Sequence, residues 1–534
     1  MASPSEHPRD RQGLSASTAA VATGMLVSRI AGLIRTMLIT RYLGISMAAE
    51  AFNAALRIPN FLQNLLGDGA MSASLIPVYV NLLAKNRQEE ADRIARAVLG
   101  VLAFITSLLV LAGVVWTSAF VDLFAAGFTG PTRDLTITIV RILFPGIGLL
   151  VMSAWCLAVL NSHRRFLLGY IAPVFWNLAM IAVLVFGHRD GQSVLAVRLA
   201  WGSAVGALLQ LGVQIPAVWT LMSGSVRAGA NAVSHEVRRV LFSALPVIFT
   251  RGAVQVSAYI DGLIASYLPS GSGAVSSLSY AQLLYSLPVS LFGMAVSAAA
   301  LPSMSAAASD PSFTQLRARL TTSRQIITVL VVPSVFAFIA LGDVIIGMLF
   351  QYGKFYRVDT LYVWGVLAGS AVGLVATTLG RLYSAAFYAT GDTRTPTIFA
   401  TIRVVLVTGL GYVGAMYVPS WIGVDPKWGA AGLTVSAGIA GWVEFTLLSR
   451  GLAARVGALG SHARFAAKTW GAVLVAGAIA SSLRLVIPVD AVVLRGVVIL
   501  GVYGILVLAG LWRLRLFETG EILKRLYALR GRRS

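Results

Sequence analysis

The sequence predicts an all-α polytopic membrane protein with about fourteen transmembrane helices, arranged as two six-helix lobes in parallel repeat plus two extra helices. Hydrophobic residues make up 57% of the 534 residues and charged residues only 12%. The mean hydropathy is +0.80, which is typical of a chain that lies mostly in lipid. Apolar segments of about 20 residues or more follow one another along most of the chain, and each is long enough to cross a bilayer.

The predicted spans are separated by Gly, Pro, Ser or charged residues, as turns require. They cover residues 15–43, 47–84, 94–124, 134–160, 166–187, 193–222, 236–268, 274–307, 321–350, 359–390, 395–418, 429–452, 465–487 and 491–513. The predicted domains are an N-terminal tail (1–14), an N-lobe (15–222), a C-lobe (236–452), an extra helix pair (465–513) and a basic C-terminal tail (514–534). Within that last tail, residues 516–531 have the pattern of a short interfacial amphipathic helix.

Lys and Arg residues are distributed unevenly between alternate loops. The set of loops that includes both termini carries 26 of them, and the opposite set carries 8. Cytoplasmic loops are enriched in Lys and Arg, so both termini are predicted to be cytoplasmic. The bias also favours an even number of spans, because an odd number would scramble the alternation.

An internal repeat is visible at an offset of about 227 residues. Residues 121–128 (VDLFAAGF) match 345–355 (IIGMLFQYGKF) at LF, G and F. Residues 160–165 (LNSHRR) fall where 387–392 (FYATGD) fall, and both loops lead to a proline. Six helices per repeat is an even number, so the two copies share one orientation, and in such transporters the substrate site lies between the lobes.

The stretch from Ser28 to Pro77 is apolar enough to enter a membrane, yet it contains charged residues. These are Arg29, Arg35, Glu50, Arg57 and Asp68. A charge at mid-bilayer costs from about 3 to more than 10 kcal/mol, so such residues are expected to face a watery cavity or a partner and to mark a substrate path. The alternative is that arginines near helix ends, such as Arg41, extend to the lipid headgroups.

Several function classes lack support in the sequence. A net charge of +21 would suggest nucleic acid in a soluble chain, but here most basic residues fall in loops and topology explains them, so no nucleic-acid partner is expected. The five histidines lie in tails or loops without ligand spacing, so no metal site is expected. No phosphate-binding loop is present, because Gly353-Lys354 lacks the upstream glycine and the Ser or Thr. The outer loops lack the pair of carboxylates that would suggest a glycosyltransferase. The chain is therefore predicted not to be an enzyme and to need no cofactor.

Six sequence motifs stand out along the chain. They are SRIAGLIR (28–35), RIPNFLQNLLGDGAMSASLIPVY (57–79), LNSHRRF (160–166), GALLQLGVQIP (206–216), LFQYGKF (349–355) and GDTRTP (391–396). Together these motifs resemble the MurJ/MviN family of lipid II flippases. The matches keep the family's order and spacing over roughly residues 20–450. The resemblance implies the MOP exporter fold, in which two lobes form a V around a central cavity, and it implies a lipid-tail groove on the last two helices.

The resemblance also implies roles for particular residues. Arg29, Arg35, Arg57 and Arg381 match basic positions expected to bind substrate, and Glu50 and Asp68 match acidic positions. The loop residues Gln351, Tyr352, Gly353 and Lys354 are candidates for a substrate gate, although turn chemistry at a helix end explains them as well. Arginines suit this role because they stay charged and bind phosphate with two parallel hydrogen bonds.

The chain departs from the family pattern at two places. Gln63 and Asn64 stand where relatives usually carry two basic residues, and Gln282 and Leu283 stand where they carry an Asp-Arg pair. Arg141, Arg251 and Arg403 are extra intramembrane arginines that could restore the charge, or could form local ion pairs. Our hypothesis is that Arg251 substitutes for the missing arginine of the eighth span.

Energy coupling is predicted to involve sodium, protons or the membrane potential. Asp261 matches a position where some relatives place a sodium-binding carboxylate, but Val407 and Gly411 stand at the partner positions, so that site looks incomplete. Asp261 could instead pair with Arg251 or relay protons. Glu444 is the other candidate proton carrier, or the counter-ion of an intramembrane pair.

The predicted function is a flippase that moves undecaprenyl-pyrophosphate-linked peptidoglycan precursor, lipid II, from the inner to the outer leaflet by alternating access. The alternatives are a flippase for another polyprenyl-linked glycan, a multidrug cation exporter, which should have an acidic cavity, and a non-transporting membrane scaffold. The expected location is the bacterial cytoplasmic (inner) membrane. The expected partners are lipid II or a related glycan, membrane lipids and cell-wall synthesis proteins.

Overall fold

The computed structural model describes residues 8–222, 242, 259–488 and 491–516. The chain separates into two compact units, Met1–Leu263 (unit 1) and Ile264–Ser534 (unit 2). The lobe boundary predicted between residues 222 and 236 lies outside the described residues, as does nearly all of the predicted amphipathic helix at 516–531. The helix of unit 1 nearest the N-terminus begins at Pro8, so residues 8–14 of the predicted N-terminal tail are helical instead.

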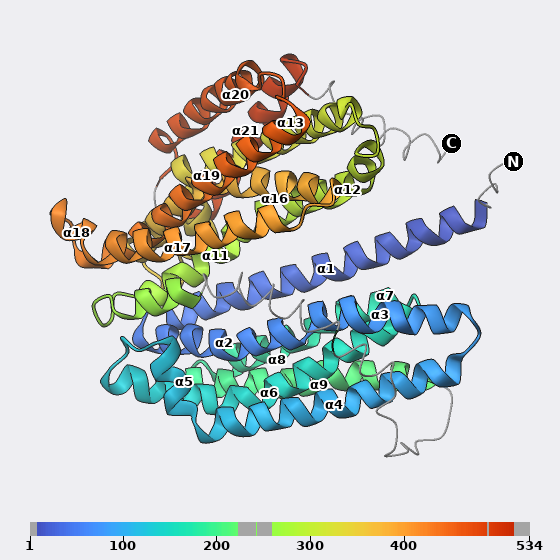
Figure 1. Ribbon diagram of the computed structural model, residues 1–534. Coiled ribbons are helices and arrows are strands. Elements are labelled where there is room, and N and C mark those ends of the chain that lie inside the picture. Colours follow the sequence, from blue (N-terminus) through green and yellow to red (C-terminus); the bar gives the residue numbers. More distant parts are fainter. Residues whose placement is uncertain (1–7, 223–241, 243–258, 489–490, 517–534) are drawn as a thin grey trace, which may run out of the picture. The chain divides into compact units, whose positions relative to one another are not determined.

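Unit 1 consists of helices that follow one another through short turns (Figure 1). These are α1 (Pro8–Leu43), α2 (Met47–Leu66), α3 (Asp68–Ala84), α4 (Gln88–Val115), α5 (Thr117–Phe124), α6 (Gly130–Ser162), α7 (Phe166–Ile171), α8 (Pro173–Gly187) and α9 (Gln192–Leu221). The long helix α6 packs against α2, α3, α4 and α9 and forms the centre of the unit. Glycine allows the close approach of α6 to α9, because a Cβ on Gly146 would lie 3.1 Å from the Ala204 backbone.

The described residues of unit 2 also form helices, which turns and short loops connect. Its α-helices are α11 (Ala274–Pro288), α12 (Ala295–Ala307), α13 (Thr314–Ala340), α14 (Gly342–Phe350), α15 (Arg357–Ala371), α16 (Leu374–Ala389), α17 (Arg394–Met416), α18 (Val418–Trp421), α19 (Gly429–Val456), α20 (Ala463–Ser482) and α21 (Val492–Arg513). Three short segments of other helical type are η1 (Val289–Met294), η2 (Pro426–Trp428) and η3 (Leu483–Leu485). The π-helical η1 directly follows Pro288, where the missing proline N–H disturbs the regular hydrogen-bond ladder.

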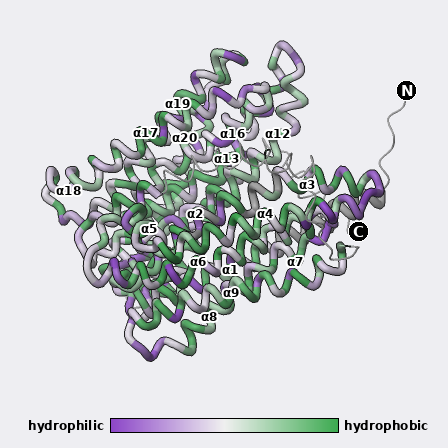
Figure 2. Tube along the Cα trace, turned by 60° about the horizontal axis from the view of Figure 1, so that its bottom comes forward, coloured by the Kyte–Doolittle hydropathy of each residue, from purple (hydrophilic) through white to green (hydrophobic). Residues whose placement is uncertain are grey.

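Twelve helices among the described residues are long and apolar enough to cross a membrane. They correspond to the predicted spans other than 47–84 and 236–268. Most of 236–268 lies outside the described residues, so the fold class is confirmed and the count of fourteen stays consistent with the structure. Figure 2 shows hydrophobic residues along the helices and hydrophilic residues gathered at many of the turns.

The predicted span over 47–84 divides into two helices, α2 and α3. The chain breaks at Gly67, whose N–H donates to the Gln63 carbonyl at 2.7 Å and whose ψ is −135°. A Cβ at this position would collide with that same carbonyl oxygen, so only glycine fits. The predicted spans 94–124, 166–187, 321–350 and 359–390 also divide into two helices each, and 274–307 is interrupted by η1.

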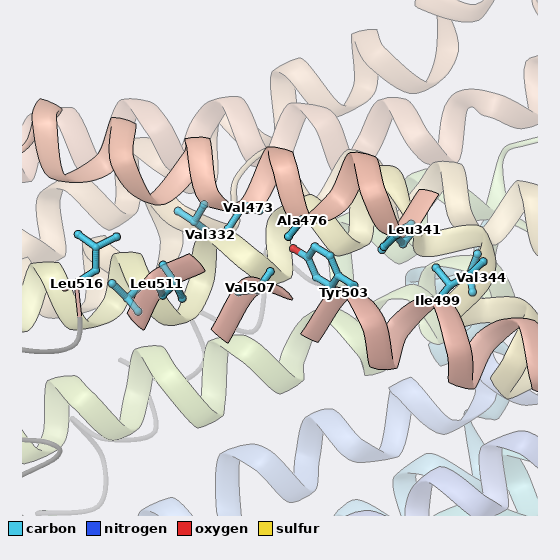
Figure 3. Packing of buried hydrophobic residues seen from close by; sticks show 12 residues of the cluster. Val332, Leu341, Val344, Val473, Ala476, Ile499, Tyr503, Val507, Leu511 and Leu516 are labelled. Carbon is cyan, nitrogen blue, oxygen red and sulfur yellow. The ribbon is translucent and has the colours of Figure 1, made fainter. Parts of the chain in front are cut away.

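The helix pair α20–α21 packs on α13 and α14 of unit 2. Figure 3 shows side chains from these helices in one apolar cluster, with Ala476 of α20 near Tyr503 of α21 and Val344 of α14 near Ile499 of α21. The Tyr503 hydroxyl of α21 donates to the Pro333 carbonyl of α13 at 2.8 Å, which adds a polar contact to this apolar packing. The extra helix pair is therefore an integral part of unit 2.

Candidate functional site

The arginines predicted on α1 lie within its membrane-spanning part, Thr23–Leu43. Arg29 occupies an exposed position and Arg35 a partly buried one. The Arg35 guanidinium carbon lies 4.7 Å from the centre of the Trp176 ring of α8, in a cation–π arrangement. Its Nε atom is buried and has no hydrogen-bond partner among the described residues. Because an aromatic face stabilises a cation without neutralising it, the positive charge of Arg35 remains available to an anion.

Arg57 on α2 lies beside the segment 259–266, which is helical. The Tyr259 hydroxyl donates to the Arg57 carbonyl at 2.9 Å, and the Tyr259 ring packs edge-on against Phe61 at a centroid distance of 4.8 Å. The Arg57 guanidinium lies close to Gly262 and interacts electrostatically with Asp261. The structure thus brings a predicted substrate-binding arginine and a predicted coupling carboxylate together in unit 1.

Gly262 is a site residue that the sequence analysis missed. A Cβ at this position would collide with the Nη1 atom of Arg57. The glycine therefore leaves the space that the guanidinium occupies. The signal in the sequence is only the Asp-Gly pair at 261–262, which is also a common turn signal.

The other acidic candidates of unit 1 are Glu50 and Asp68, and the structure describes the side chain of Glu50 alone. Glu50 is 4% exposed, in the first turn of α2, where a carboxylate complements the helix dipole. Asp68 is the first residue of α3, and its side chain lies outside the described residues. Arg251 also lies outside them, so its proposed substitution for the missing eighth-span arginine stays a prediction.

A second charged cluster lies in unit 2. The Arg403 Nη1 atom of α17 donates to the Glu444 carboxylate of α19 at 3.1 Å. Arg381 of α16 interacts electrostatically with both of these groups and with Tyr285. Glu444 is therefore the counter-ion of an intramembrane pair, and whether it also carries protons stays a prediction.

The loop predicted as a gate, Gln351–Lys354, is a tight turn between α14 and α15. Gly353 adopts a φ of +61°, which glycine allows without strain. The Thr360 hydroxyl donates to Gln351 Oε1 at 3.1 Å, and the Tyr352 hydroxyl donates to the Met348 carbonyl at 2.9 Å. Lys354 is exposed. These contacts all stabilise the turn. A gating role for the four residues stays a prediction.

Phe350 and Phe355 flank this turn and anchor it. Both are buried, and their rings lie 5.9 and 6.3 Å from the Tyr280 ring of α11. Tyr280 directly precedes the Ala281-Gln282-Leu283 stretch at which this chain departs from the family pattern. Gln282 itself occupies an exposed position of α11.

A buried polar group of unit 1 joins α3 and α4 to the turn after α6. The Tyr79 hydroxyl donates to the Asp92 carboxylate at 2.6 Å and lies 3.0 Å from His163 Nε2. Since the single hydroxyl proton goes to Asp92, His163 Nε2–H is the donor to the Tyr79 oxygen. Burial lowers the pKa of His163, and the nearby Asp92 carboxylate opposes that shift. The sequence analysis missed this group because His163 is far from Tyr79 and Asp92 along the chain.

Comparisons with known proteins decide the family. The family model described as "Lipid II flippase MurJ" matches residues 39–511 of this chain. The chain belongs to the MurJ family. A "Lipid II flippase MurJ" of Burkholderia cenocepacia is 33% identical over 436 residues, which cover 80% of this chain and 82% of that protein. A "Probable lipid II flippase MurJ" of Rhizobium meliloti is 31% identical over 438 residues, which cover 80% and 79%.

Solved structures show that the fold is that of the MOP superfamily. A structure titled "Lipid II flippase MurJ, inward closed conformation" aligns with a TM-score of 0.76 at 22% identity, over 92% of this chain and 99% of that chain. An inward-facing multidrug resistance MATE family transporter of the MOP superfamily aligns with a TM-score of 0.67 at 17% identity, over 82% and 98%. The predicted fold class and the predicted family are both confirmed.

Proposed function

We propose that this MurJ family member is a flippase that moves lipid II from the inner to the outer leaflet by alternating access. The supporting observation is its family membership at 33% identity to a lipid II flippase over 436 residues. As a transporter it makes and breaks no covalent bond, and it needs no cofactor. Its site is the bacterial cytoplasmic (inner) membrane, with both termini in the cytoplasm, as the distribution of Lys and Arg between loops suggests.

The substrate presents an anion that must cross an apolar region. A pyrophosphate carries about two negative charges, and its transfer into hydrocarbon costs many kcal/mol without compensation. Arg29, Arg35 and Arg57 lie on helices of unit 1 and supply guanidinium groups that suit phosphate. We assign them to headgroup binding, and Arg381 of unit 2 to a supporting role.

The membrane potential is a sufficient driving force for this direction of transport. An inside-negative potential favours outward movement of an anion by about 2.3 kcal/mol per charge per 100 mV. Two charges therefore gain about 5 kcal/mol per 100 mV, without a bound coupling ion. We assign to Asp261 the role of counter-ion to Arg57 when the substrate is absent, based on their electrostatic interaction. Sodium or proton coupling through Asp261 or Glu444 is the alternative.

Complementation of cells depleted of their own lipid II flippase tests the proposal. The wild-type chain should restore growth, whereas Arg29→Ala at equal expression should not. Arg41→Ala is the matched control, because Arg41 is an exposed residue in the last turn of the same helix and should be dispensable. If an expressed wild-type chain fails to rescue, the substrate is another polyprenyl-linked glycan or the chain is a membrane scaffold. Gln282 and Leu283, in place of the family's Asp-Arg pair, favour this second candidate.

A further inference from the structure

A small polar pocket lies in unit 2 where three helices begin. It is lined by Asp343 and Gly347 of α14, Gln351, Arg357 of α15 and Arg495 of α21. Its interior has a volume of about 10 Å³, which is room for one water-sized group. Asp343, Arg357 and Arg495 belong to the first turns of their helices, so three helix dipoles add positive potential there.

The described residues around this pocket carry excess positive charge. The Asp343 carboxylate is 6% exposed and accepts from Arg484 at 2.7 Å and from Arg357 at 3.4 Å. Arg495 forms no ion pair with any described residue, and its buried Nε has no hydrogen-bond partner there. The pocket is therefore lined by one carboxylate and two arginines, and a third guanidinium group, of Arg484, binds the same carboxylate.

Gln351 adds neutral donors to the same pocket. Its Oε1 atom already accepts from the Thr360 hydroxyl at 3.1 Å. The amide nitrogen of Gln351 therefore presents its two N–H groups as donors, and no described acceptor engages them. Guanidinium and amide donors around one small space form the pattern that binds an oxygen of a phosphate group.

The surroundings of the pocket are apolar and exposed. Val493, Leu494 and Val497 of α21 are 51%, 59% and 59% exposed, next to Arg495 along the chain. Val344 lines the pocket and also belongs to the apolar cluster that contains Ile499, one turn after Arg495 (Figure 3). The span formed by α21 begins at Val492, so Arg495 lies near the membrane surface. The loops that form the pocket belong to the set predicted to face away from the cytoplasm.

We propose that this pocket binds the phosphate group of a membrane lipid in the outer leaflet. One phosphate oxygen enters between Gln351, Arg357 and Arg495, and the acyl chains lie along the exposed apolar residues of α21. A soluble phosphate lacks the apolar part that these exposed residues would cover, so the surroundings favour a lipid. The site is separate from Arg29, Arg35 and Arg57, and it does not depend on which substrate is transported.

Native mass spectrometry of the detergent-solubilised full chain tests the proposal with added phosphatidylglycerol. Diacylglycerol with the same acyl chains serves as the lipid that lacks a phosphate. The wild-type chain should bind phosphatidylglycerol at least tenfold more tightly than diacylglycerol, and Arg495→Gln should weaken phosphatidylglycerol binding about tenfold. Arg133→Gln is the control, because Arg133 is a surface arginine of unit 1 paired with Asp122 at 2.7 Å.

A second variant separates lipid binding from stability. A Cβ on Gly347 would meet its neighbours at 3.4 Å or more, so Gly347→Ala fits and fills the pocket while every charge remains. It should raise the Tm, because alanine favours a helix, and still weaken phosphatidylglycerol binding several-fold. Gly212→Ala, at a helix position with nothing within 4 Å, should leave lipid binding unchanged.

Three results would overturn the proposal. The first is that Arg495→Gln and Gly347→Ala both bind phosphatidylglycerol as the wild type does. The second is that phosphatidylglycerol and diacylglycerol bind equally. The third is that inorganic pyrophosphate binds to the wild-type chain without displacing lipid, and that Arg495→Gln weakens this pyrophosphate binding. That result would identify a soluble anion as the ligand.

Discussion

In unit 2, Arg403 donates to the Glu444 carboxylate at 3.1 Å, whereas in unit 1 the Arg35 guanidinium stacks on the Trp176 ring at 4.7 Å. An ion pair removes most of the field of both charges, but a cation–π contact leaves the net charge in place. Arg35 of unit 1 and Arg403 of unit 2 therefore differ in their surroundings. Arg35 keeps a positive charge that no ion pair with a described residue neutralises, while Arg403 forms a charge pair that ties α17 to α19.

Arg35→Gln should have the largest effect, because it removes a positive charge that the described part of unit 1 does not neutralise by an ion pair. We expect at least a tenfold loss of lipid II transport, which corresponds to about 1.4 kcal/mol. The readout is the share of lipid II exposed in the outer leaflet at equal expression. Arg41→Gln is the control, since its guanidinium lies 5.8 Å from the Tyr42 ring at the end of the same helix. Equal transport by Arg35→Gln would remove the distinction between the units.

Glu444→Gln should lower the stability of unit 2, because Arg403 would then lie near Arg381 without its counter-ion. Loss of one partner of a partly buried pair costs about 1–3 kcal/mol. Thermal unfolding in detergent measures the change. The double variant Glu444→Gln with Arg403→Gln should recover most of the lost Tm, because it removes both charges. A double variant that is no more stable than Glu444→Gln alone would mean that the pair does not stabilise the unit.

Gly262→Ala should lower transport a few-fold, because the added methyl group displaces the Arg57 guanidinium. The Tm should change little, since the displaced atom is the end of a flexible side chain. Gly212→Ala is the matched control, at a position where a Cβ meets nothing within 4 Å. Transport at the wild-type level in Gly262→Ala would show that the position of Arg57 is not critical.

The two equivalent loops of the repeat, residues 160–165 and 387–392, should contribute to stability in different pH ranges. This should be the smallest of the predicted effects. Burial lowers the pKa of His163, so the folded state favours the neutral ring. The stability that His163 contributes to the folded state is therefore lost as the pH falls below about 6.5. Hydrogen bonds from Thr395 lower the pKa of Asp392 to about 2, so its contribution is full above about 4 and is lost toward pH 2.

Profiles of Tm against pH distinguish these two loops. Between pH 7.5 and 5.5 the Tm of the wild type should fall, and His163→Gln should flatten that part of the profile. Asp392→Asn should lower the Tm by a similar amount throughout that range and should approach the wild type only near pH 2. A parallel fall of wild type and His163→Gln would show that His163 does not cause the pH dependence.

The sequence predicted the apolar elements well, because each span depends on local hydrophobicity. The break at Gly67 within 47–84 was not predicted, because it arises from a backbone conformation that hydropathy does not detect. The candidate arginines could also be identified from the sequence, because a charge inside an apolar segment stands out. The contacts could not be predicted from the sequence. Arg57 with Asp261 is the clearest case, because these residues are far apart along the chain and the contacts of Tyr259 with Arg57 and Phe61 hold their segments together.

The sequence by itself determined the helical class, the approximate positions of the spans, the family and the arginines that suit an anionic headgroup. These depend on residue type and order, because the free energy of placing each segment in the bilayer depends on the residues of that segment. Only the tertiary structure decided that Arg35 meets an aromatic ring, that Glu444 meets an arginine and that Arg357 and Arg484 converge on Asp343. The physical reason is that the field around a charge depends on neighbours within a few ångströms, and helix packing brings those neighbours from distant parts of the chain.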